Sequence, residues 1–513
     1  MLFHACARRV VPSAFPISTM PLRARIANPA LMARQSSSSS SSSSSNITLT
    51  EQPGDDPHDV LFASHFGLRT ITLNRPKKLN SLNASMARKI LSRLREWRKS
   101  QLAEVVVIKG AGRAFCAGGD VAALALQNQQ GVEGQRASTD YFALEYTLDH
   151  AIATYPKPYL ALLDGITMGG GVGLSLHAPF RIATENTVFA MPETTIGFFP
   201  DVGASFFLPR LDGALGLYLA LTSAQLHGVD VFWSGVATHY LHSTSLPDLE
   251  ARLAELRFPD STPLQTLLRL INSTIEEFCT GFPKPPTASL VGGDLRAAID
   301  YVFQPGHRSL DDIFNALRGL EDQRQQTPPD IVDWAKKTRE TLLQRSPTSA
   351  HVTLRQLREG ARWDIAETFR RELGLAERFM SHPDFVAGVS ALLIHKPKTT
   401  PIWTPARFED VKAVDVARFF SSPSTELALA DDVEGQTATG WPWRMYPHSW
   451  TALPGEGEVK RVLREMGEKA QSGDDVVEEV VRRRDGKAGV REKVEDILRR
   501  KTMNENGLVV WRT

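Results

Sequence analysis

Two short apolar runs lead directly into glycine-rich turns, and this pairing constrains the fold more than any other feature of the chain. Residues 105–108 (VVVI) run into GAGRAFCAGGD, and residues 159–163 (YLALL) run into DGITMGGGVG. A short, wholly apolar run bounded by turn residues is typical of a strand that is buried on both faces. The pattern therefore predicts a parallel sheet with functional loops at the ends of its strands.

The segments around these runs show the same alternation of strand, turn and helix. Residues 60–65 and 70–73 alternate like two strands around a turn, and Asn83 can cap a helix that ends near Lys99. The other elements predicted before residue 225 are helices at residues 141–155 and 171–177 and strands at residues 180–183 and 188–191. This repetition predicts an α/β fold.

The rest of the chain is predicted to be mainly helical. From residue 246 to residue 380 the pattern is helical, with interruptions at proline clusters. Near the C-terminus, apolar residues recur at helical spacing in residues 459–466 and 490–498, and acidic and basic residues nearly cancel. We expect a folded domain over residues 58–405, followed by a partly helical extension over residues 406–513.

The N-terminal segment has the composition of a targeting sequence. Its first 50 residues contain five arginines but no Asp, Glu or Lys, and residues 36–45 are all serine. An Arg-rich, Ser-rich and acid-free segment is typical of a mitochondrial transit peptide, and a serine run cannot bury apolar area. We expect a transit peptide and spacer over residues 1–46 and a location in the mitochondrial matrix. The alternative is a disordered tail without an address.

Composition excludes several classes of function. The chain has 513 residues, of which 42% are hydrophobic, and a formal net charge of +1, so no global charge favours nucleic acid. Three cysteines are too few for a disulfide framework, and no Cys/His cluster suggests a metal. No apolar run approaches the length of a membrane span. We therefore expect neither a metal nor another cofactor.

The two glycine-rich turns could carry chemistry. Glycine lets the backbone approach a ligand closely, and two converging N–H donors stabilise an oxyanion. The alternative is that both turns only link elements. The chain has no dinucleotide-binding fingerprint, no GxxxxGK[ST] phosphate loop and no GxSxG nucleophile elbow, so the competing glycine motifs are not supported.

Carboxylates accompany these turns. In FAMPETTIGFFPDVG, Glu193 and Asp201 each follow a proline that fixes the local backbone. Such a pair could divide the roles of nucleophile or base and of acid or orienting group. The alternative is that both residues cap helices. Glu145 lies in an apolar helical stretch, where the pattern alone does not select it.

Three further residues near the turns are predicted to be structural. Asp120 can cap a helix that starts at Val121. Cys116 has no obvious His partner and is interpreted as a small apolar filler. His177 is interpreted as a core histidine.

Four segments together resemble the crotonase (enoyl-CoA hydratase/isomerase) superfamily. They are LNRPKKLNSLN, GAGRAFCAGGD, DGITMGGGVGLSLH and FAMPETTIGFFPDVG. Within the superfamily, ITMGGGVGLS, FLPRL, SPTS..VTLRQL and the late DF..GV.A.LI segment most resemble the 3-hydroxyisobutyryl-CoA hydrolase subfamily. The resemblance covers roughly residues 58–405, and its motifs are specific because they occur together and in order.

The resemblance implies a spiral of ββα units with helices packed around it. It implies that the N–H groups of Gly119 and Gly170 hold the thioester oxygen. It also implies that Glu193 and Asp201 are catalytic, and that Glu145, with Gly170 and the two catalytic carboxylates, binds the acyl substrate.

The chain also departs from relatives of the superfamily. Hydratases use a second glutamate that would fall at Gly173, and its absence argues against addition of water to an enoyl-CoA. Asp201 stands where hydratases typically have glycine, and His395 stands where relatives often carry an acid. In the basic segment RPKK (residues 75–78), Lys77 is the candidate for contact with the CoA phosphates, and the alternative is a solvated surface.

The implied activity is hydrolysis of 3-hydroxyisobutyryl-CoA in valine breakdown, with CoA present only as part of the substrate. One alternative is another crotonase activity, such as hydratase or isomerase. A second is a built-in protein of the mitochondrial small ribosomal subunit, with contacts to protein and rRNA, because relatives of this subfamily occur in that role. The two roles can coexist, and the sequence leaves self-association into a homo-oligomer open.

Overall fold

The structure is a computed structural model that describes most of residues 49–513. The stretches outside the description are residues 1–48, 260–261, 280, 282, 284–288, 324, 422–425, 430–443, 468–469, 471, 506–507 and 513. The expected transit peptide and spacer over residues 1–46 therefore lie outside the described residues. The described residues belong to one compact unit that extends from Asn46 to Thr513.

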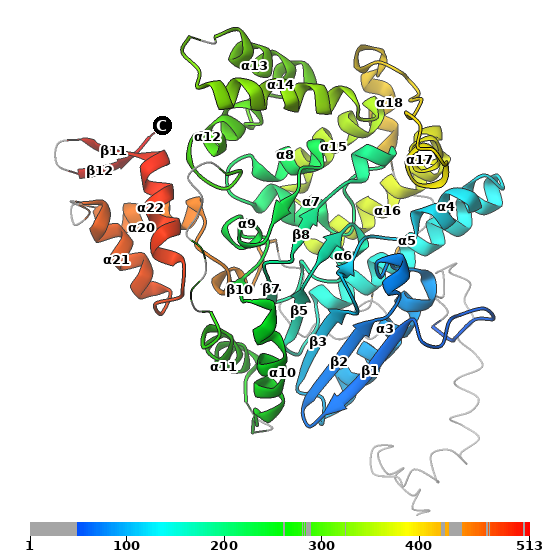
Figure 1. The fold of residues 1–513 in the computed structure, drawn as a ribbon, viewed down its shortest axis with the longest axis horizontal. Coiled ribbons are helices and arrows are strands. Elements are labelled where there is room, and N and C mark those ends of the chain that lie inside the picture. Colours follow the sequence, from blue (N-terminus) through cyan, green and yellow to red (C-terminus); the bar gives the residue numbers. More distant parts are fainter. Residues whose placement is uncertain are drawn as a thin grey trace, which may run out of the picture. The chain divides into compact units, whose positions relative to one another are not determined.

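A six-stranded sheet forms the first layer of the core (Figure 1). In spatial order its strands are β1 (Val60–His65), β2 (Leu68–Leu73), β3 (Val105–Gly110), β5 (Tyr159–Leu163), β7 (Phe180–Ala183) and β10 (His239–Tyr240). Strands β1 and β2 pair antiparallel, and all other neighbours are parallel. Every side chain of β5 is buried, as its apolar sequence predicts.

A second sheet has four shorter strands. They are β4 (Ala114–Cys116), β6 (Ile166–Met168), β8 (Val188–Ala190) and β9 (Leu226–His227), in that order. Along the chain, β3 is followed by β4, β5 by β6 and β7 by β8, so a strand of the first sheet is each time followed by a short strand of the second sheet and then by a helical segment. This repeated ββα unit confirms the predicted α/β spiral.

The helices that face the sheets confirm some predicted boundaries and correct others. Helix α3 (Ala84–Lys99) begins where predicted, and the Asn83 side chain accepts a 2.9 Å hydrogen bond from the Met86 N–H. Helix α4 (Val121–Asn128) begins at the predicted residue, whereas α5 (Val132–Ala153) begins before the predicted residue 141 and is longer than expected. Helix α6 (Gly170–Gly173) is shorter than the predicted 171–177. After residue 174 the bonds are mixed: Ser175 and Ala178 donate to i−3 carbonyls and Leu176 donates to an i−4 carbonyl, while the Ser175 hydroxyl bonds back to the Gly171 carbonyl at 2.7 Å.

A layer of helices follows the sheets, as the helical pattern predicts over residues 246–380; the last two of these helices lie beyond that range and were not predicted. These helices are α10 (Leu246–Glu255), α11 (Leu264–Glu276), α12 (Gly293–Val302), α13 (Leu310–Asp322), α14 (Pro329–Leu343), α15 (Pro347–Gly360), α16 (Ile365–Ser381), α17 (Pro383–Val389) and α18 (Ala413–Phe419). Helix α16 packs along α5, and α15 packs against α7 (Ala204–Phe207). None of the described helices is both long enough and apolar enough to cross a bilayer.

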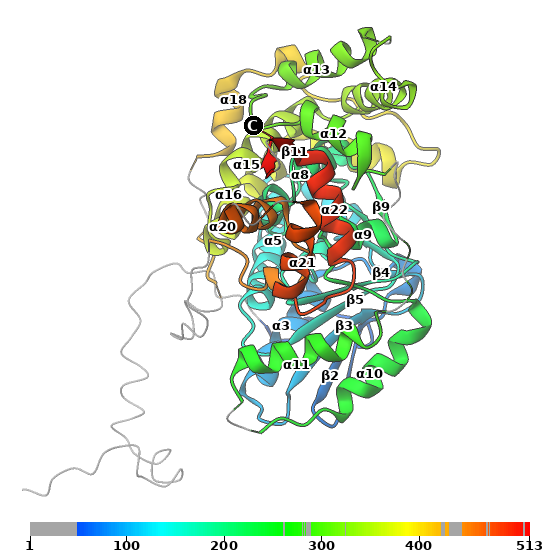
Figure 2. The same ribbon diagram turned by 90° about the vertical axis from the view of Figure 1, so that its left-hand side faces the viewer.

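The C-terminal module, residues 445–512, contains α20 (Glu456–Met466), α21 (Gly473–Arg483) and α22 (Val490–Lys501). It ends in a hairpin of β11 (Thr502–Glu505) and β12 (Leu508–Trp511), which the sequence pattern did not predict (Figure 1). Figure 2 shows the three helices of the module from the side that faces the viewer. The valines of the module at helical spacing, such as Val459 and Val494, are fully buried and belong to the same hydrophobic core as Leu215. The module is therefore part of the compact unit.

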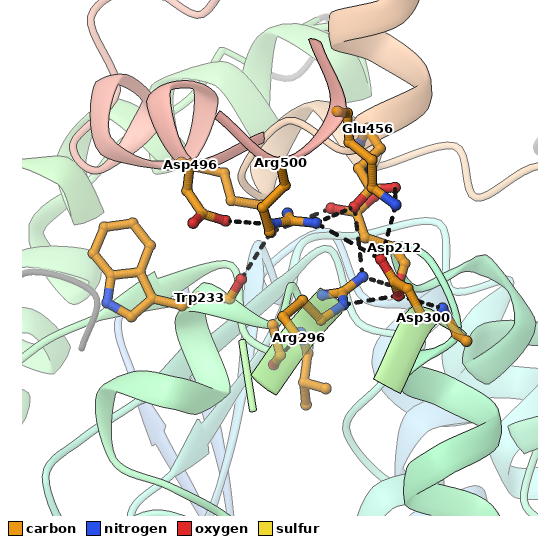
Figure 3. Close-up of polar contacts among 12 residues, drawn as sticks. Asp212, Trp233, Arg296, Asp300, Glu456, Asp496 and Arg500 are labelled. Atoms are coloured by element: carbon orange, nitrogen blue, oxygen red, sulfur yellow. Dashed lines mark hydrogen bonds and ion pairs between the residues drawn. The ribbon is translucent and has the colours of Figure 1, made fainter. Parts of the chain in front are cut away.

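A buried network of charges joins this module to the core (Figure 3). Arg296 of α12 has no exposed side-chain area and lies 3.6 Å from Glu456 of α20, while Arg500 of α22 lies 3.7 Å from Asp300 of α12. Within each part, Arg296 also pairs with Asp300 at 3.1 Å and Arg500 with Glu456 at 3.0 Å. Lys493 reaches Asp212 at 3.2 Å. Burial alone would raise the pKa of Asp212, but the charges of Lys493 and Arg296 outweigh it and lower that pKa.

Candidate functional site

The two glycine-rich turns lie side by side. They follow β4 and β6, which are parallel neighbours, so their carboxyl ends open at the same edge. Leu82 bonds to the groups that flank Gly119: its N–H donates to the Gly118 carbonyl, and its carbonyl accepts from the Asp120 N–H, both at 2.8 Å. The Gly119 N–H therefore points away from Leu82. A Cβ atom placed on Gly170 would lie 3.4 Å from the Gly119 nitrogen.

The amide groups of Gly119 and Gly170 are available to a ligand. Gly170 is the first residue of α6, where an N–H group has no partner within the helix. Among the residues that the structure describes, none accepts a hydrogen bond from either amide. The predicted pair of donors is thus brought together, with both groups unpaired.

Helix α5 brings two carboxyl groups against α6. Glu145 and Asp149 lie one helical turn apart, and both are buried. A Cβ atom on Gly170 would overlap the Glu145 carboxyl, and one on Gly173 would lie under 3.0 Å from the Asp149 carboxyl atoms. Asp149 therefore fills the space that a side chain at position 173 would need. The sequence pattern did not point to Asp149.

Glu193 and Asp201 complete the cluster. Glu193 begins a short 3-10 helix, η3 (Glu193–Ile196), and its Oε1 atom lies 3.1 Å from where a Cβ atom on Gly169 would be. Asp201 accepts a 2.8 Å hydrogen bond from the Tyr146 hydroxyl. Neither carboxylate caps a helix, because α7 has Gly203 at its N-cap position and no side-chain cap. The helix-cap alternative is wrong for both.

Burial shifts the protonation of these groups. Burial raises the pKa of Glu193 well above its ordinary value, and the charge of Asp201 raises it further. The pKa of Glu145 is raised well above its usual range by the same two causes. Burial raises the pKa of Asp201 to about 7, against the hydrogen bond from Tyr146, which lowers it. A carboxyl group with a pKa near 7 is suited to exchanging a proton at neutral pH.

Two later helices hold the loop that carries Asp201. Glu372 of α16 accepts hydrogen bonds from the Gly203 N–H at 2.7 Å and from the Ser205 N–H and hydroxyl at 2.9 and 2.6 Å. Gln356 of α15 donates to the Pro200 carbonyl at 2.6 Å. Sequence reasoning missed both roles, although Gln356 lies within the quoted SPTS..VTLRQL motif.

The other residues named from the sequence have mixed outcomes. Lys77 is exposed and lies in a short 3-10 helix, η2 (Pro76–Lys78), and Arg75 directly before this helix pairs with Asp120 at 3.0 Å, beside Gly119. Asp120 stands at the N-cap position of α4, but its side chain makes no cap bond, because it pairs with Arg75 instead. Cys116 is fully buried, and burial raises the pKa of its thiol to about 12, which makes it inert.

His177 is a core residue, as predicted. It is 1% exposed, and its Nε2 atom lies 2.9 Å from the Val202 carbonyl oxygen. Burial lowers the pKa of His177 to about 4, so it is neutral at physiological pH.

Comparison with known proteins places this geometry in a family. A model of the family described as enoyl-CoA hydratase/isomerase matches residues 68–420. The chain belongs to the enoyl-CoA hydratase/isomerase family. This family member matches a carnitinyl-CoA dehydratase structure from Mycobacterium thermoresistibile with a TM-score of 0.62 and 32% identity, over 72% of this chain and 99% of that one. The crotonase fold expected from the sequence is thereby confirmed.

Two relatives of this chain have different names, one that of an enzyme and one that of a ribosomal protein. A mitochondrial 3-hydroxyisobutyryl-CoA hydrolase from Danio rerio is 44% identical over 365 residues, which cover 71% of this chain and 90% of that protein. The small ribosomal subunit protein mS47 from Neurospora crassa is 50% identical over 464 residues, which cover 90% of this chain and 89% of that protein. The match to mS47 is long enough that it must include more than half of residues 406–513.

Proposed function

We propose that the chain hydrolyses 3-hydroxyisobutyryl-CoA to 3-hydroxyisobutyrate and CoA. The observation that carries this proposal is the pair of unpaired amides at Gly119 and Gly170 beside the Glu193 carboxyl group. Such donors stabilise a tetrahedral oxyanion, and each contributes about 3 kcal/mol in the transition state. The Danio rerio hydrolase supports the substrate assignment. Mitochondrial relatives favour a place in the mitochondrial matrix, where the product would belong to valine breakdown.

The site offers a role to each carboxylate. The thioester carbonyl accepts hydrogen bonds from Gly119 and Gly170, which polarise it. Glu193, in its ionised form, either attacks the carbonyl carbon to give a mixed anhydride and CoA thiolate, or takes a proton from the attacking water. Asp201 positions the β-hydroxyl group of the acyl chain, and Glu145 shapes the acyl pocket. No cofactor is needed for these steps, and Lys77 is the proposed contact to the CoA phosphates.

Substitution of Glu193 tests this assignment. We expect purified E193Q to lose at least about 100-fold in kcat on 3-hydroxyisobutyryl-CoA, because Gln neither attacks nor accepts the proton. The thermal midpoint should be close to that of wild type, since Gln has the same shape and the Glu193 Oε2 atom has no described partner. A fully active variant, or a wild-type protein that hydrates crotonyl-CoA faster than it hydrolyses the thioester, would contradict the proposal.

Oxygen labelling separates the two roles of Glu193. In a single turnover in H₂¹⁸O, a labelled oxygen on the enzyme carboxyl is diagnostic of attack by Glu193, because water that opens the anhydride at the Glu193 carbonyl carbon leaves its oxygen there. Opening at the acyl carbonyl carbon puts the label in the product instead. General-base catalysis puts the label only in the product. Mass spectrometry of the peptide that contains Glu193 reads out the difference.

The second candidate function is a built-in place in the mitochondrial small ribosomal subunit. It is favoured by one observation: the match to mS47 includes most of the C-terminal extension, whereas the Danio rerio hydrolase match covers 71% of the chain. This role involves contacts with protein and rRNA and can accompany hydrolysis. Co-sedimentation with mitochondrial small subunits at high salt tests it. A protein that remains at the top of the gradient, as a monomer or a homo-oligomer, is a free enzyme.

A further inference from the structure

A cavity of about 560 Å³ lies between the core and the C-terminal module. Phe206, Phe207 and Leu211 line it from the core, and Leu453 and Gly457 line it from the module. Its volume falls in the range of small-molecule sites. Its lining includes none of the carboxylates or glycine turns of the proposed active site. The proposed hydrolysis therefore gives this cavity no role.

The charges around the cavity do not balance. Five cationic and two anionic side chains line it. Both anionic side chains form ion pairs with cationic lining residues: Glu458 pairs with Arg484, and Asp212 pairs with Lys493 at 3.2 Å. The three cations left over are Arg181, Arg210 and Arg461. In the described part of the chain, no carboxylate lies within ion-pair distance of any of the three.

Two of these arginines are held in place by neutral groups. Arg181 is 4% exposed and donates to the Val236 carbonyl and the Tyr446 hydroxyl, both at 2.7 Å. Arg210 lies over the Phe206 ring at 3.7 Å and donates to backbone carbonyls. Burial lowers the pKa of Arg210 to about 10, so it is still charged at neutral pH. Arg461 of α20 is exposed, and no described residue bonds its guanidinium group.

Cations in a partly buried site without a counter-charge favour binding of an anion. Removing a charge from water has a cost that a nearby opposite charge offsets. The aromatic and aliphatic walls add apolar surface for the body of a ligand, and arginine is suited to carboxylate and phosphate groups. The free guanidinium of Arg461 is the group best placed to make a new contact.

We propose that this cavity binds a small amphipathic anion, in which a carboxylate, sulfonate or phosphate group is carried on an apolar body. The anionic group lies near Arg461, and the apolar body lies against Phe207 and Leu211, which are partly exposed to the cavity. One wall comes from the C-terminal module, so the site exists only while that module is docked. The proposal is independent of the hydrolase function.

Two dyes that differ by one charge test the proposal on the full chain. The probes are 8-anilinonaphthalene-1-sulfonate and its uncharged counterpart, N-phenyl-1-naphthylamine. We expect the sulfonate to bind more tightly, and Arg461→Gln to weaken it about tenfold, the effect of losing one charge-assisted contact. The same substitution should leave the affinity for the uncharged dye unchanged. Arg464→Gln, on the same helix but outside the cavity lining, is the matched control.

A second pair of variants tests the place of binding. A Cβ atom on Gly457 or on Gly319 of α13 would meet nothing within 4 Å, but only Gly457 lines the cavity. Gly457→Phe should abolish binding of both dyes, and Gly319→Phe should change neither. Equal affinity for the two dyes, equal effects of R461Q and R464Q, or full binding by G457F would each overturn the proposal. Thermal midpoints show whether the variants are folded.

Discussion

At the scale of single residues, the site depends on glycines, which have no side chain, as much as on carboxyl groups. Gly170 and Gly173 present bare backbone to α5, and two carboxyl groups fill the space. Asp149 has neither oxygen bonded to a described residue. The hydratases that the chain resembles have a glutamate at the position of Gly173. Here glycine is required at this position because the Asp149 carboxyl group occupies the space of a side chain.

This packing predicts a measurable coupling. Gly173→Ala should lower the free energy of unfolding by about 1–3 kcal/mol, because the new methyl group would overlap the Asp149 carboxyl. Asp149→Ala alone should cost little, since it removes a buried carboxyl without a partner. The double variant should recover most of the loss. Urea unfolding of the four proteins measures the coupling, and strictly additive effects would show that the two residues do not compete for space.

Asp201 also predicts a dependence of stability on pH. Its pKa is about 7 in the folded protein and near 4 in the unfolded chain, so the folded state holds a proton that the unfolded state has lost. Its contribution is fully present below pH 4 and falls by about 1.4 kcal/mol per pH unit until pH 7. Asp201→Asn should flatten this slope. Urea unfolding at pH 5, 6 and 7 compares the two proteins, and parallel curves would contradict the assigned pKa.

The sequence located the two carboxylates that we propose to be catalytic, but not the groups around them. Glu193 and Asp201 stand in a continuous segment, next to prolines, and the resemblance selected them. Asp149 and Glu372 lie in helices far away along the chain, and their approach depends on how those helices pack. A lone acid in an apolar helix is usually solvated, so the pattern gave no reason to place either of them in the site.

At the scale of elements, α15 and α16 act on a loop of the ββα core. Glu372 receives three hydrogen bonds from the residues after Asp201, and these fix the backbone there. The helical pattern predicted both helices. It could not predict this contact, because the donors are mostly backbone N–H groups, which any sequence carries.

Substitution of Glu372 should therefore affect catalysis through Asp201. Glu372→Gln places an N–H group against N–H donors, so we expect kcat to fall at least tenfold while the affinity for CoA itself is retained. Glu367→Gln, on the exposed face of the same helix, removes only a surface ion pair with Arg371 and is the matched control. Steady-state kinetics and CoA titration check the result. An E372Q enzyme as active as E367Q would show that the loop does not need this clamp.

At the scale of the whole molecule, the C-terminal module is held by both apolar packing and buried charge. The period of its valines predicted two helices, α20 and α22. The hairpin and the docking were not predictable, because the charges that join the module to α12 look like a solvated surface in the sequence. Only the structure shows that Arg296 and Arg500 are withdrawn from water.

Breaking this network should release the module. Arg296→Met keeps the volume but leaves Asp300 and Glu456 short of a cation, at a cost of about 3–5 kcal/mol. We expect faster hydrogen exchange in α20 and α22 and unchanged exchange in β5. Arg482→Gln, which removes an exposed pair with Glu479, should leave both unchanged. Equal exchange in wild type and R296M would mean that apolar packing alone holds the module.

The contact between Gly173 and Asp149 also bears on how such a chain can evolve. A side chain at one position is acceptable only if the other position is small, so the two sites are epistatic. A lineage that acquired Asp149 while position 173 was glycine could not acquire a glutamate there by a single substitution. An intermediate with both side chains would overpack the helix interface, so this contact makes a glutamate at position 173 difficult to acquire while Asp149 is in place.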